Sequence, residues 1–345
     1  MNNNRINNNR INNNRINNNH INNRRRQLRK RKQRRRILVS ILIEMVILVL
    51  LAGAFCWNRG LKAGVSGMFG GFDKPPVKNV DVTGVNSSNV ILMDVKSGNV
   101  IGDLNGKEQI YPASMTKIMT AIVALEAFSD LDREITLSQD IFYALNGQDA
   151  TQAGFQAGES VRIRDLVYGV ILPSGAECCL ALADEVAGSE DAFVEKMNQK
   201  AKSIGMKNTN FKNCTGLHDP DHYSTAYDIA LLLKYALHND TFRDVIESHF
   251  HSTPGTNVHP DGITYYSTMF KNMSDTTVTG GEILGGKTGY TSEAGHCLAS
   301  FAQIYDREYI LVTAGAAADA TGVPHILDAK TIYDRLGEAV AASAR

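Results

Sequence analysis

Cysteine is scarce in this chain of 345 residues, and the spacing of its cysteines matches no metal-binding framework. Besides Cys56, only Cys178, Cys179, Cys214 and Cys297 occur. The two adjacent cysteines would point to different faces of a helix, which makes a shared framework harder to build. The four cysteines after Cys56 are an even number, which permits disulfides if the part of the chain that contains them is exported. We expect four buried free thiols.

Neither sign of charge is in excess over the whole chain, which has 36 Lys and Arg and 36 Asp and Glu. Thirteen of the basic residues precede residue 37, however, and only one acidic residue, Glu44, precedes residue 58. The rest of the chain therefore has 23 basic and 35 acidic residues, a net charge of −12. Such an acidic balance is typical of a soluble domain and argues against nucleic acid as a partner.

Three segments of biased composition lie within the first 78 residues of the chain. Residues 2–23 repeat an Asn-Asn-Asn-Arg-Ile pattern that offers no face to bury, and ten Lys or Arg follow in residues 24–36. We therefore predict a disordered tail over residues 1–36. Residues 58–78 hold five glycines and two prolines, which break regular elements, so we predict a linker there.

A long apolar run separates the basic tail from the linker. Residues 37–56 include thirteen Ile, Leu, Val or Phe, and twenty residues are enough to cross a bilayer. Glu44 inside the run costs about 3 kcal/mol on an insertion scale, whereas the apolar side chains contribute about 4 to 8 kcal/mol. Trp57 follows at the expected interface. The run is longer than a cleaved signal needs, so we predict an uncleaved transmembrane signal anchor over residues 37–57.

The basic residues before this anchor predict its orientation. Lys and Arg collect on the cytoplasmic side of membrane helices, so residues 1–36 are expected in the cytoplasm and the domain after the linker outside it. A basic run can also bind nucleic acid. Its position beside the membrane explains it better, through contact with anionic lipid heads. We expect a single-pass protein of the cell membrane with an extracytoplasmic domain.

Residues 79–345 are enough for one compact domain with a full core. An apolar run at 90–95, a turn at 96–99 and Val100-Ile101 predict a β-hairpin. Helical patterns dominate residues 114–247. The later pattern predicts strands at 282–289, 296–303 and 308–314 and a helix at 325–340. Strands at both ends with helices between them favour an α+β domain with an antiparallel sheet.

Three short motifs carry the chemistry of the domain. They are Ser114-Met115-Thr116-Lys117, Ser174-Gly175-Ala176 and Lys287-Thr288-Gly289. A Ser-x-x-Lys pair arises by chance about once in a chain of this length, and a given tripeptide in roughly one chain in twenty. In this order, however, they are typical of enzymes that form an acyl-enzyme on serine. The sequence thus predicts attack by a serine on a peptide or lactam carbonyl.

The spacing of the first motif has a chemical reason. On a helix over residues 114–127, Ser114 and Lys117 share a face, so the amine can reach the hydroxyl. A serine needs a base, and lysine serves only if its pKa falls far below about 10.4. Burial or a second cation, for which Lys287 is a candidate, would lower it. Apolar residues at helical spacing support the helix, namely Ile118, Ile122 and Leu125.

The motifs and the residues around them resemble the D-alanyl-D-alanine carboxypeptidases, the low-molecular-mass penicillin-binding proteins of bacterial cell-wall metabolism. The resemblance runs from about residue 80 to residue 333. The segments that carry it are residues 111–120, 161–166, 172–175, 205–213, 222–228 and 286–291. It implies a β-lactamase/transpeptidase-like fold, in which an antiparallel sheet is flanked by helices and joined by a mainly helical subdomain.

The resemblance also implies a role for each catalytic residue. Ser114 would be acylated by the substrate carbonyl, with release of D-alanine, and water would then release the acyl group. Lys117 would be the general base, and Ser174 would relay protons between the lysines and the leaving amine. The backbone amides of Ser114 and Tyr290 would form the oxyanion hole. No metal or organic cofactor would be needed.

The third motif would bind the substrate. Lys287 and Thr288 would hold its terminal carboxylate, beside Gly289 and Tyr290. The family often places an arginine just before the last helix for the same purpose, and the matching residue here is His325. The resemblance implies a peptidoglycan stem peptide ending in D-Ala-D-Ala as substrate and β-lactam antibiotics as covalent inhibitors.

Two residues depart from the family pattern. The second motif usually ends in asparagine, which contacts the nucleophile's lysine and the substrate, but here it ends in Ala176. A missing donor costs about 1–3 kcal/mol of transition-state binding, which slows an enzyme without abolishing its activity. Glu177 is a candidate replacement, but it lies one step along the helix, so we interpret it as a solvated helix residue. His325 is only partly charged at neutral pH. It is either a weaker, pH-dependent carboxylate ligand or a surface histidine.

Two alternative functions follow from the same motifs. A β-lactamase would need a carboxylate-activated water, and the second motif lacks the usual Asp-Asn ending. A penicillin-binding protein with weak catalysis, acting as a membrane interaction module, is favoured by Ala176. Residues 218–222 contain side chains that can bind metals, but the resemblance assigns them to a structural loop.

Overall fold

The computed structural model describes residues 77–343. The chain divides into two units, residues 1–73 and 74–345, and the described residues belong to the second. The predicted tail, the predicted anchor and all but the last two residues of the predicted linker lie outside the described residues, so they stay predictions. Within residues 77–343, no helix is both long enough and apolar enough to cross a membrane.

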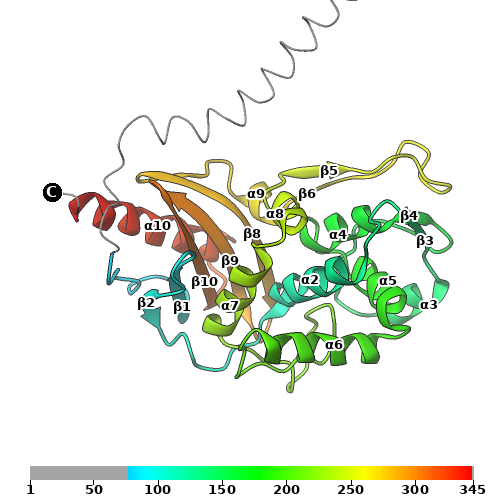
Figure 1. Cartoon of the computed structure of the whole chain (residues 1–345), viewed down its shortest axis with the longest axis horizontal. Coiled ribbons are helices and arrows are strands. Elements are labelled where there is room, and N and C mark those ends of the chain that lie inside the picture. The colour runs from blue at the N-terminus through cyan, green and yellow to red at the C-terminus, as the bar shows by residue number, and fades with distance from the viewer. Residues whose placement is uncertain (1–76, 344–345) are drawn as a thin grey trace, which may run out of the picture. The chain divides into compact units, whose positions relative to one another are not determined.

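A six-stranded antiparallel sheet lies at the centre of the domain, with the strand order β2-β1-β10-β9-β8-β7 (Figure 1). The strands are β1 (Asn89–Asp94), β2 (Val100–Leu104), β7 (Thr277–Val278), β8 (Gly281–Thr291), β9 (Gly295–Ile304) and β10 (Arg307–Ala316). The predicted hairpin is confirmed as β1 and β2, and the three later strands as β8, β9 and β10. The first hairpin therefore joins the late strands through the pairing of β1 with β10.

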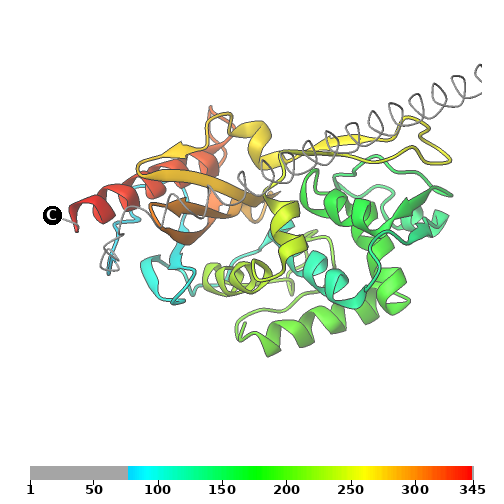
Figure 2. The same ribbon diagram turned by 45° about the horizontal axis from the view of Figure 1, so that its top comes forward.

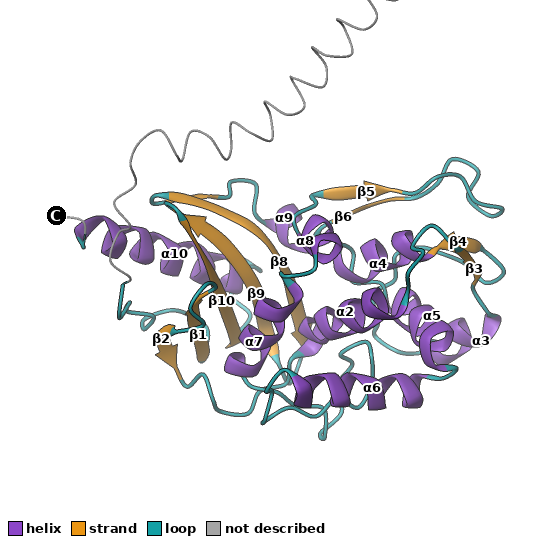
Figure 3. Ribbon diagram, in the orientation of Figure 1, coloured by secondary structure: helices purple, strands orange, loops and turns teal. Residues whose placement is uncertain are grey.

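Both faces of the sheet are buried, each in its own core. Side chains of a strand alternate between the two faces, so each strand contributes to both cores. In β1, Ile91 and Met93 join the core shared with the helical subdomain, whereas Val90 and Leu92 join a second core under the last helix. That helix, α10 (Pro324–Ala342), packs on β9 and β10 and confirms the predicted C-terminal helix. Figure 3 shows α10 on one side of the sheet and most of the other helices on the opposite side. The short helix Thr268–Asn272 contributes to the core under α10.

Helices fill most of the chain between β2 and β7, as predicted. They are the 3-10 turn η1 (Ala113–Thr116) and the helices α2 (Lys117–Ala127), α3 (Gln139–Ala144), α4 (Ile163–Ile171), α5 (Ala176–Ala187), α6 (Glu190–Ser203), α7 (Ala226–Ala236), α8 (Asp240–Ile246) and α9 (Thr268–Asn272).

Two short antiparallel strand pairs interrupt the helices. The first pairs β3 (Glu134–Thr136) with β4 (Ser160–Arg162) across a connection that contains α3, and the second is a hairpin of β5 (Phe250–Ser252) and β6 (Thr264–Tyr266). Figure 2 shows the hairpin running over the helical subdomain. Neither pair is predicted from the sequence, because three residues are too few to display an alternating pattern.

The central helix of the subdomain is α2. Every residue from Lys117 to Leu125 is buried, because α4, α5, α6, α7 and α8 all pack against α2. The predicted apolar stripe is therefore present but forms only part of a helix that is buried on all sides. This environment brings Lys117, at the first position of α2, into the interior of the protein.

Candidate active site

Ser114 lies in η1, half-buried between the sheet and α2. The residue before it, Ala113, has a φ of +46°, a left-handed conformation that is strained for a residue with a Cβ atom. Next to it on β8 is Gly289, where an added Cβ would lie 3.1 Å from the Ser114 nitrogen. The glycine thus allows β8 to run directly beside Ser114.

Lys117 is in hydrogen-bond contact with Ser114. Its Nζ atom lies 3.1 Å from Ser114 Oγ and 2.5 Å from the carbonyl oxygen of Thr215. Only 4% of Lys117 is exposed, and burial lowers its pKa, against the opposing effect of nearby thiols and Glu177. In its neutral form the amine has a lone pair for the Ser114 proton. Of the two causes expected from the sequence, burial is therefore the one that dominates.

Ser174 completes a chain of three polar groups. Its hydroxyl donates to Ser114 Oγ at 3.0 Å. Ser174 is buried and has a φ of +71°, again in the left-handed region. It lies between α4 and α5, which both pack against α2, so the two helices fix the turn that carries it. The structure thus brings Ser114, Lys117 and Ser174 together as the sequence motifs predict.

The third motif lies on β8. Lys287 is fully buried and donates to the Thr288 carbonyl oxygen at 3.0 Å. Burial lowers the pKa of Lys287 well below its ordinary value, and the charge of Lys117 lowers it further. The hydroxyl of Thr288 lies 2.7 Å from that of Thr268. Within residues 77–343, no hydrogen bond joins Lys287 to the first two motifs. The contact between the motifs is made through Gly289.

Tyr290 and His325 lie at the end of this strand. Tyr290 is 57% exposed, and its ring centroid is 4.6 Å from that of His296. His296 in turn stacks on His325 at 5.0 Å. Of the two alternatives for His325, the surface histidine is wrong, since His325 is buried at the start of α10. Burial lowers the pKa of His325 to about 4, so the imidazole is neutral at pH 7.

The interpretation of Glu177 as a solvated helix residue is also wrong. Glu177 is fully buried near the start of α5, where its Oε1 atom accepts hydrogen bonds from the backbone N–H groups of Ala153 and Gly154 at 2.6 and 2.8 Å. Ala176 is buried as well, and its own N–H donates to the Thr151 carbonyl oxygen at 2.8 Å. Both residues contact the loop 151–155, and no pattern in the sequence predicts the position of this loop.

The sequence motifs do not predict the loop that supplies the Thr215 carbonyl oxygen to Lys117. The side chain of Asn213 shapes it by accepting the N–H groups of Thr215 at 3.2 Å and Gly216 at 2.7 Å. Gly216 has a φ of +81°, and a Cβ there would lie 2.0 Å from the Ala113 oxygen. The one available signal was the Asn-Cys-Thr-Gly run, because asparagine and glycine mark tight turns.

The expected buried free thiols are confirmed. Cys178, Cys179, Cys214 and Cys297 are all buried and unpaired. Burial raises the pKa of Cys179 to about 12 and that of Cys297 equally, so neither carries the thiolate that a reactive cysteine needs.

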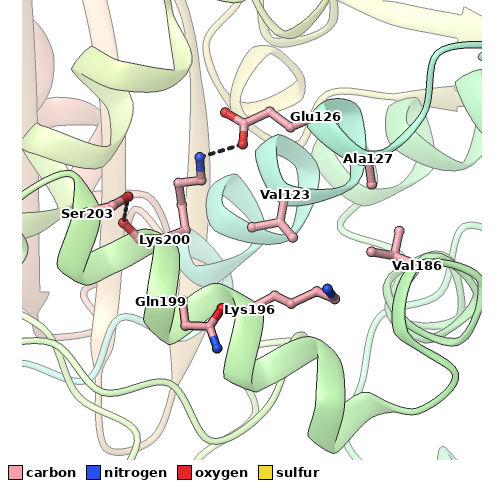
Figure 4. A pocket seen from close by; sticks show the side chains of 8 residues that line it. All are labelled: Val123, Glu126, Ala127, Val186, Lys196, Gln199, Lys200 and Ser203. Carbon is pink, nitrogen blue, oxygen red and sulfur yellow. Dashed lines mark hydrogen bonds and ion pairs between the residues drawn. The ribbon is translucent and has the colours of Figure 1, made fainter.

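A cavity of about 420 Å³ lies away from these motifs, between the end of α2, α5 and α6 (Figure 4). Lys200 pairs with Glu126 across it at 2.5 Å. Its other lining residues are Val123, Ala127, Val186, Lys196, Gln199 and Ser203. None of them belongs to the three motifs, so the cavity is distinct from the candidate active site.

Comparison with known proteins identifies the family. The model of the D-alanyl-D-alanine carboxypeptidase family matches residues 76–318, and the chain belongs to this family. It is 32% identical to the carboxypeptidase DacF of Bacillus subtilis over 71% of this chain and 61% of that protein. It is 34% identical to DacC of Escherichia coli over 76% of this chain and 65% of that protein. The chain thus spans less than two thirds of the length of these relatives.

The fold comparison agrees. The crystal structure of the Streptomyces K15 DD-transpeptidase has a TM-score of 0.65 at 26% identity, covering 75% of this chain and 98% of that one. The domain therefore has the α+β, transpeptidase-like fold of the penicillin-binding proteins, with an antiparallel sheet and helices, as expected from the sequence.

Proposed function

We propose that the protein is a serine D-alanyl-D-alanine carboxypeptidase that removes the terminal D-alanine from peptidoglycan stem peptides. One observation carries the proposal. Ser114 Oγ lies within hydrogen-bond distance of both Lys117 Nζ and Ser174 Oγ. Family membership supplies the substrate class. The same chemistry would make Ser114 the residue that β-lactams acylate.

The reaction would proceed through an ester on Ser114. Neutral Lys117 takes the hydroxyl proton while Oγ attacks the carbonyl carbon of the penultimate D-alanine. The backbone N–H groups of Ser114 and Tyr290 stabilise the oxyanion. As the peptide bond breaks, the proton passes through Ser174 to the leaving amine of D-alanine. Water then cleaves the ester and returns the serine.

Substrate recognition would depend on the terminal carboxylate. Lys287 and Thr288 lie on the strand beside the nucleophile, and a bound carboxylate would raise the pKa of Lys287 again by its opposite charge. His325 contributes no positive charge at neutral pH, because burial keeps it neutral. Carboxylate binding would therefore rest on the Lys-Thr pair alone.

We also propose that residues 37–57 anchor the protein in the cell membrane with its domain outside the cytoplasm. Support comes from the apolar run, its basic flank and Trp57. In spheroplasts that make the full chain, added protease should degrade the domain and leave residues 1–36 protected. Degradation of the basic tail instead would reverse the orientation.

The test of the activity is D-alanine release by the purified full chain from an acylated Lys-D-Ala-D-Ala peptide. Release is expected, and a Ser114→Ala variant should abolish it. A folded protein that releases no D-alanine would overturn the proposal.

Ala176 favours a second candidate, a penicillin-binding interaction protein with weak catalysis. Such a protein would form a stable acyl-enzyme with penicillin yet hydrolyse no peptide. Rapid turnover of the antibiotic would instead indicate a β-lactamase. The same preparation separates these cases from the proposed function.

A further inference from the structure

Glu177 is a fully buried carboxylate that the proposed reaction does not use. Its Oε1 atom accepts the two N–H groups of Ala153 and Gly154. Its Oε2 atom is equally buried and has no hydrogen-bond partner among the described residues. A buried carboxylate is costly unless its surroundings compensate it, so its presence next to the second motif requires an explanation.

The first part of that explanation is mechanical. The loop 151–155, which Glu177 holds, lies directly against the turn that carries Ser174. A Cβ added at Gly175 would lie 2.9 Å from the Ala153 Cβ and 3.0 Å from Glu177 Oε2. The Ala176 N–H also donates to this loop, at the Thr151 oxygen.

Ser174 needs such support. Its left-handed φ of +71° is strained for any residue other than glycine, and strained residues persist only where their surroundings hold them. The Gly175 N–H donates to the Gly169 oxygen at 2.8 Å, and its carbonyl oxygen accepts the Cys179 thiol at 3.2 Å. The turn is therefore held by α4 and α5 through these two hydrogen bonds and by the loop 151–155 that lies against Gly175.

The second part is electrostatic. The titratable groups that interact with Lys117 are Glu177, Cys178 and Cys179 from α5, Cys214 and His222 from the loop before α7, and Lys287 from β8. Glu177 is the only carboxylate in this set of described groups. Burial raises the pKa of Glu177 itself, and the hydrogen bonds from the N–H groups of Gly154 and Ala153 oppose that rise. In its ionised form, Glu177 favours the protonated form of Lys117 by its negative charge, against the effect of burial on Lys117.

We propose that Glu177 is a positioning residue of the acylation step, which holds Ser174 in reach of Ser114 and balances the charge of Lys117 where Ala176 supplies no amide. The inference rests on the proposed function, because it assigns Glu177 to that same site. Glu177 acts through the 151–155 loop and through its charge, and it does not touch the reacting atoms.

Two substitutions separate these effects in the full chain. Glu177→Gln keeps an oxygen for the two N–H groups and removes only the charge. Glu177→Ala removes both. Glu159→Gln is the control, because Glu159 is equally buried and accepts the N–H of Gln156 at 2.9 Å and the Thr256 hydroxyl at 2.6 Å, besides pairing with His259 at 2.8 Å. None of these partners belongs to the loop 151–155 or to the turn that carries Ser174. Acylation of Ser114 by a fluorescent penicillin is measured against pH, together with hydrogen exchange of the amides of Ala153 and Gly154.

In Glu177→Ala, acylation is expected to slow about ten-fold or more, as for the loss of hydrogen bonds to a charged group. The two amides should exchange faster. Glu177→Gln should keep most of the rate at neutral pH, but the acid limb of its pH profile should move to lower pH, because Lys117 then loses its proton more easily. Glu159→Gln should leave acylation within about two-fold of the wild type.

A Glu177→Ala variant that is acylated at the wild-type rate would overturn the proposal. So would a Glu159→Gln variant whose acylation slows as much as that of Glu177→Ala. An acid limb that lies at the same pH in Glu177→Gln and in the wild type would overturn it as well. The proposed function has its own readout, since D-alanine release can fail while penicillin still acylates Ser114 and reports on Glu177. A wild-type chain that penicillin does not acylate would overturn both.

Discussion

Lys117 illustrates how a single residue acquires an unusual property from its position. Its amine lies at the first turn of a helix that five others surround, and it meets one hydroxyl and one carbonyl oxygen. Neither partner is a carboxylate that would hold the proton by direct pairing. Burial therefore determines the protonation state, and lowers the pKa.

This predicts the pH dependence of acylation. The rate should rise with pH as Lys117 loses its proton, along a limb that lies below the usual lysine pKa of about 10.4, because burial lowers the pKa of Lys117. The Lys117→Arg variant should be acylated roughly 10²- to 10⁴-fold more slowly than the wild type, since a guanidinium stays protonated and cannot act as the base. Rates of acylation by penicillin between pH 5 and pH 10 measure both. A limb near 10.4, or an active arginine variant, would contradict the role of Lys117 as base.

Gly216 provides a second prediction at the residue scale. In Gly216→Ala the new Cβ would meet the Ala113 oxygen, in addition to the strain of a φ of +81°. Gly188 is a matched control, because its φ is +79° and nothing lies within 4 Å of an added Cβ. Urea denaturation should show a loss of about 1 kcal/mol for Gly188→Ala and at least twice that for Gly216→Ala.

Only Gly216→Ala should also slow acylation, because the clash displaces the residue before Ser114. Equal effects of the two substitutions on stability and acylation would show that the contact with Ala113 has no importance.

At the scale of elements, α10 closes one side of the sheet. Leu336 is fully buried in the core that α10 forms with the strands, whereas Leu327 of the same helix is 43% exposed. Leu336→Ala should lower the free energy of unfolding by about 2–5 kcal/mol and Leu327→Ala by less than about 0.5 kcal/mol. Denaturant unfolding measures both. A small loss at Leu336 would mean that α10 adds little to the stability of the domain.

The elements that the sequence predicts well are the long ones. The strands β8, β9 and β10 and the helix α10 each contain enough residues to repeat a pattern. The three-residue strands β3 to β6 have no such repeat, and their pairing depends on contacts with residues far along the chain. One example is the bond from the Tyr265 hydroxyl to the Asp165 oxygen, which fastens β6 to α4.

At the scale of the whole molecule, two buried histidines predict sensitivity to acid. Burial lowers the pKa of His222 and of His325 to about 4. His222 also lies 2.8 Å from the Thr116 hydroxyl and accepts the Lys212 N–H at 3.2 Å, which requires an unprotonated ring nitrogen. The unfolded chain protonates both histidines near pH 6.5, whereas the folded protein does so only near pH 4.

The free energy of unfolding should therefore fall as the pH drops from 6.5 to 4, by roughly 1.4 kcal/mol per pH unit for each histidine. Above pH 6.5 the two histidines should make no further change to the free energy of unfolding. Denaturation curves of the wild type and of His325→Gln at several pH values give the test. The variant should show a flatter dependence over this range, and an unchanged slope would mean that His325 is protonated in the folded protein.

The sequence by itself determined the motifs, their order and the family, because these depend on residue types at short spacing. It also determined the α+β class, since long strands at both ends and helices between them leave clear periodic patterns. The two departures from the family pattern, Ala176 and His325, were visible as well. The environment of His325 stayed open between two alternatives, and Glu177 was assigned to a wrong environment.

Only the tertiary structure decided what surrounds those residues. The Thr215 oxygen lies 98 positions from Lys117 along the chain, and the loop under Glu177 lies 23 and 24 positions before it. Burial is a property of all the elements around a side chain, so a helix position next to a motif does not reveal whether water reaches it. The pKa values of Lys117, Lys287 and His325 follow from that burial, and therefore belong to the fold.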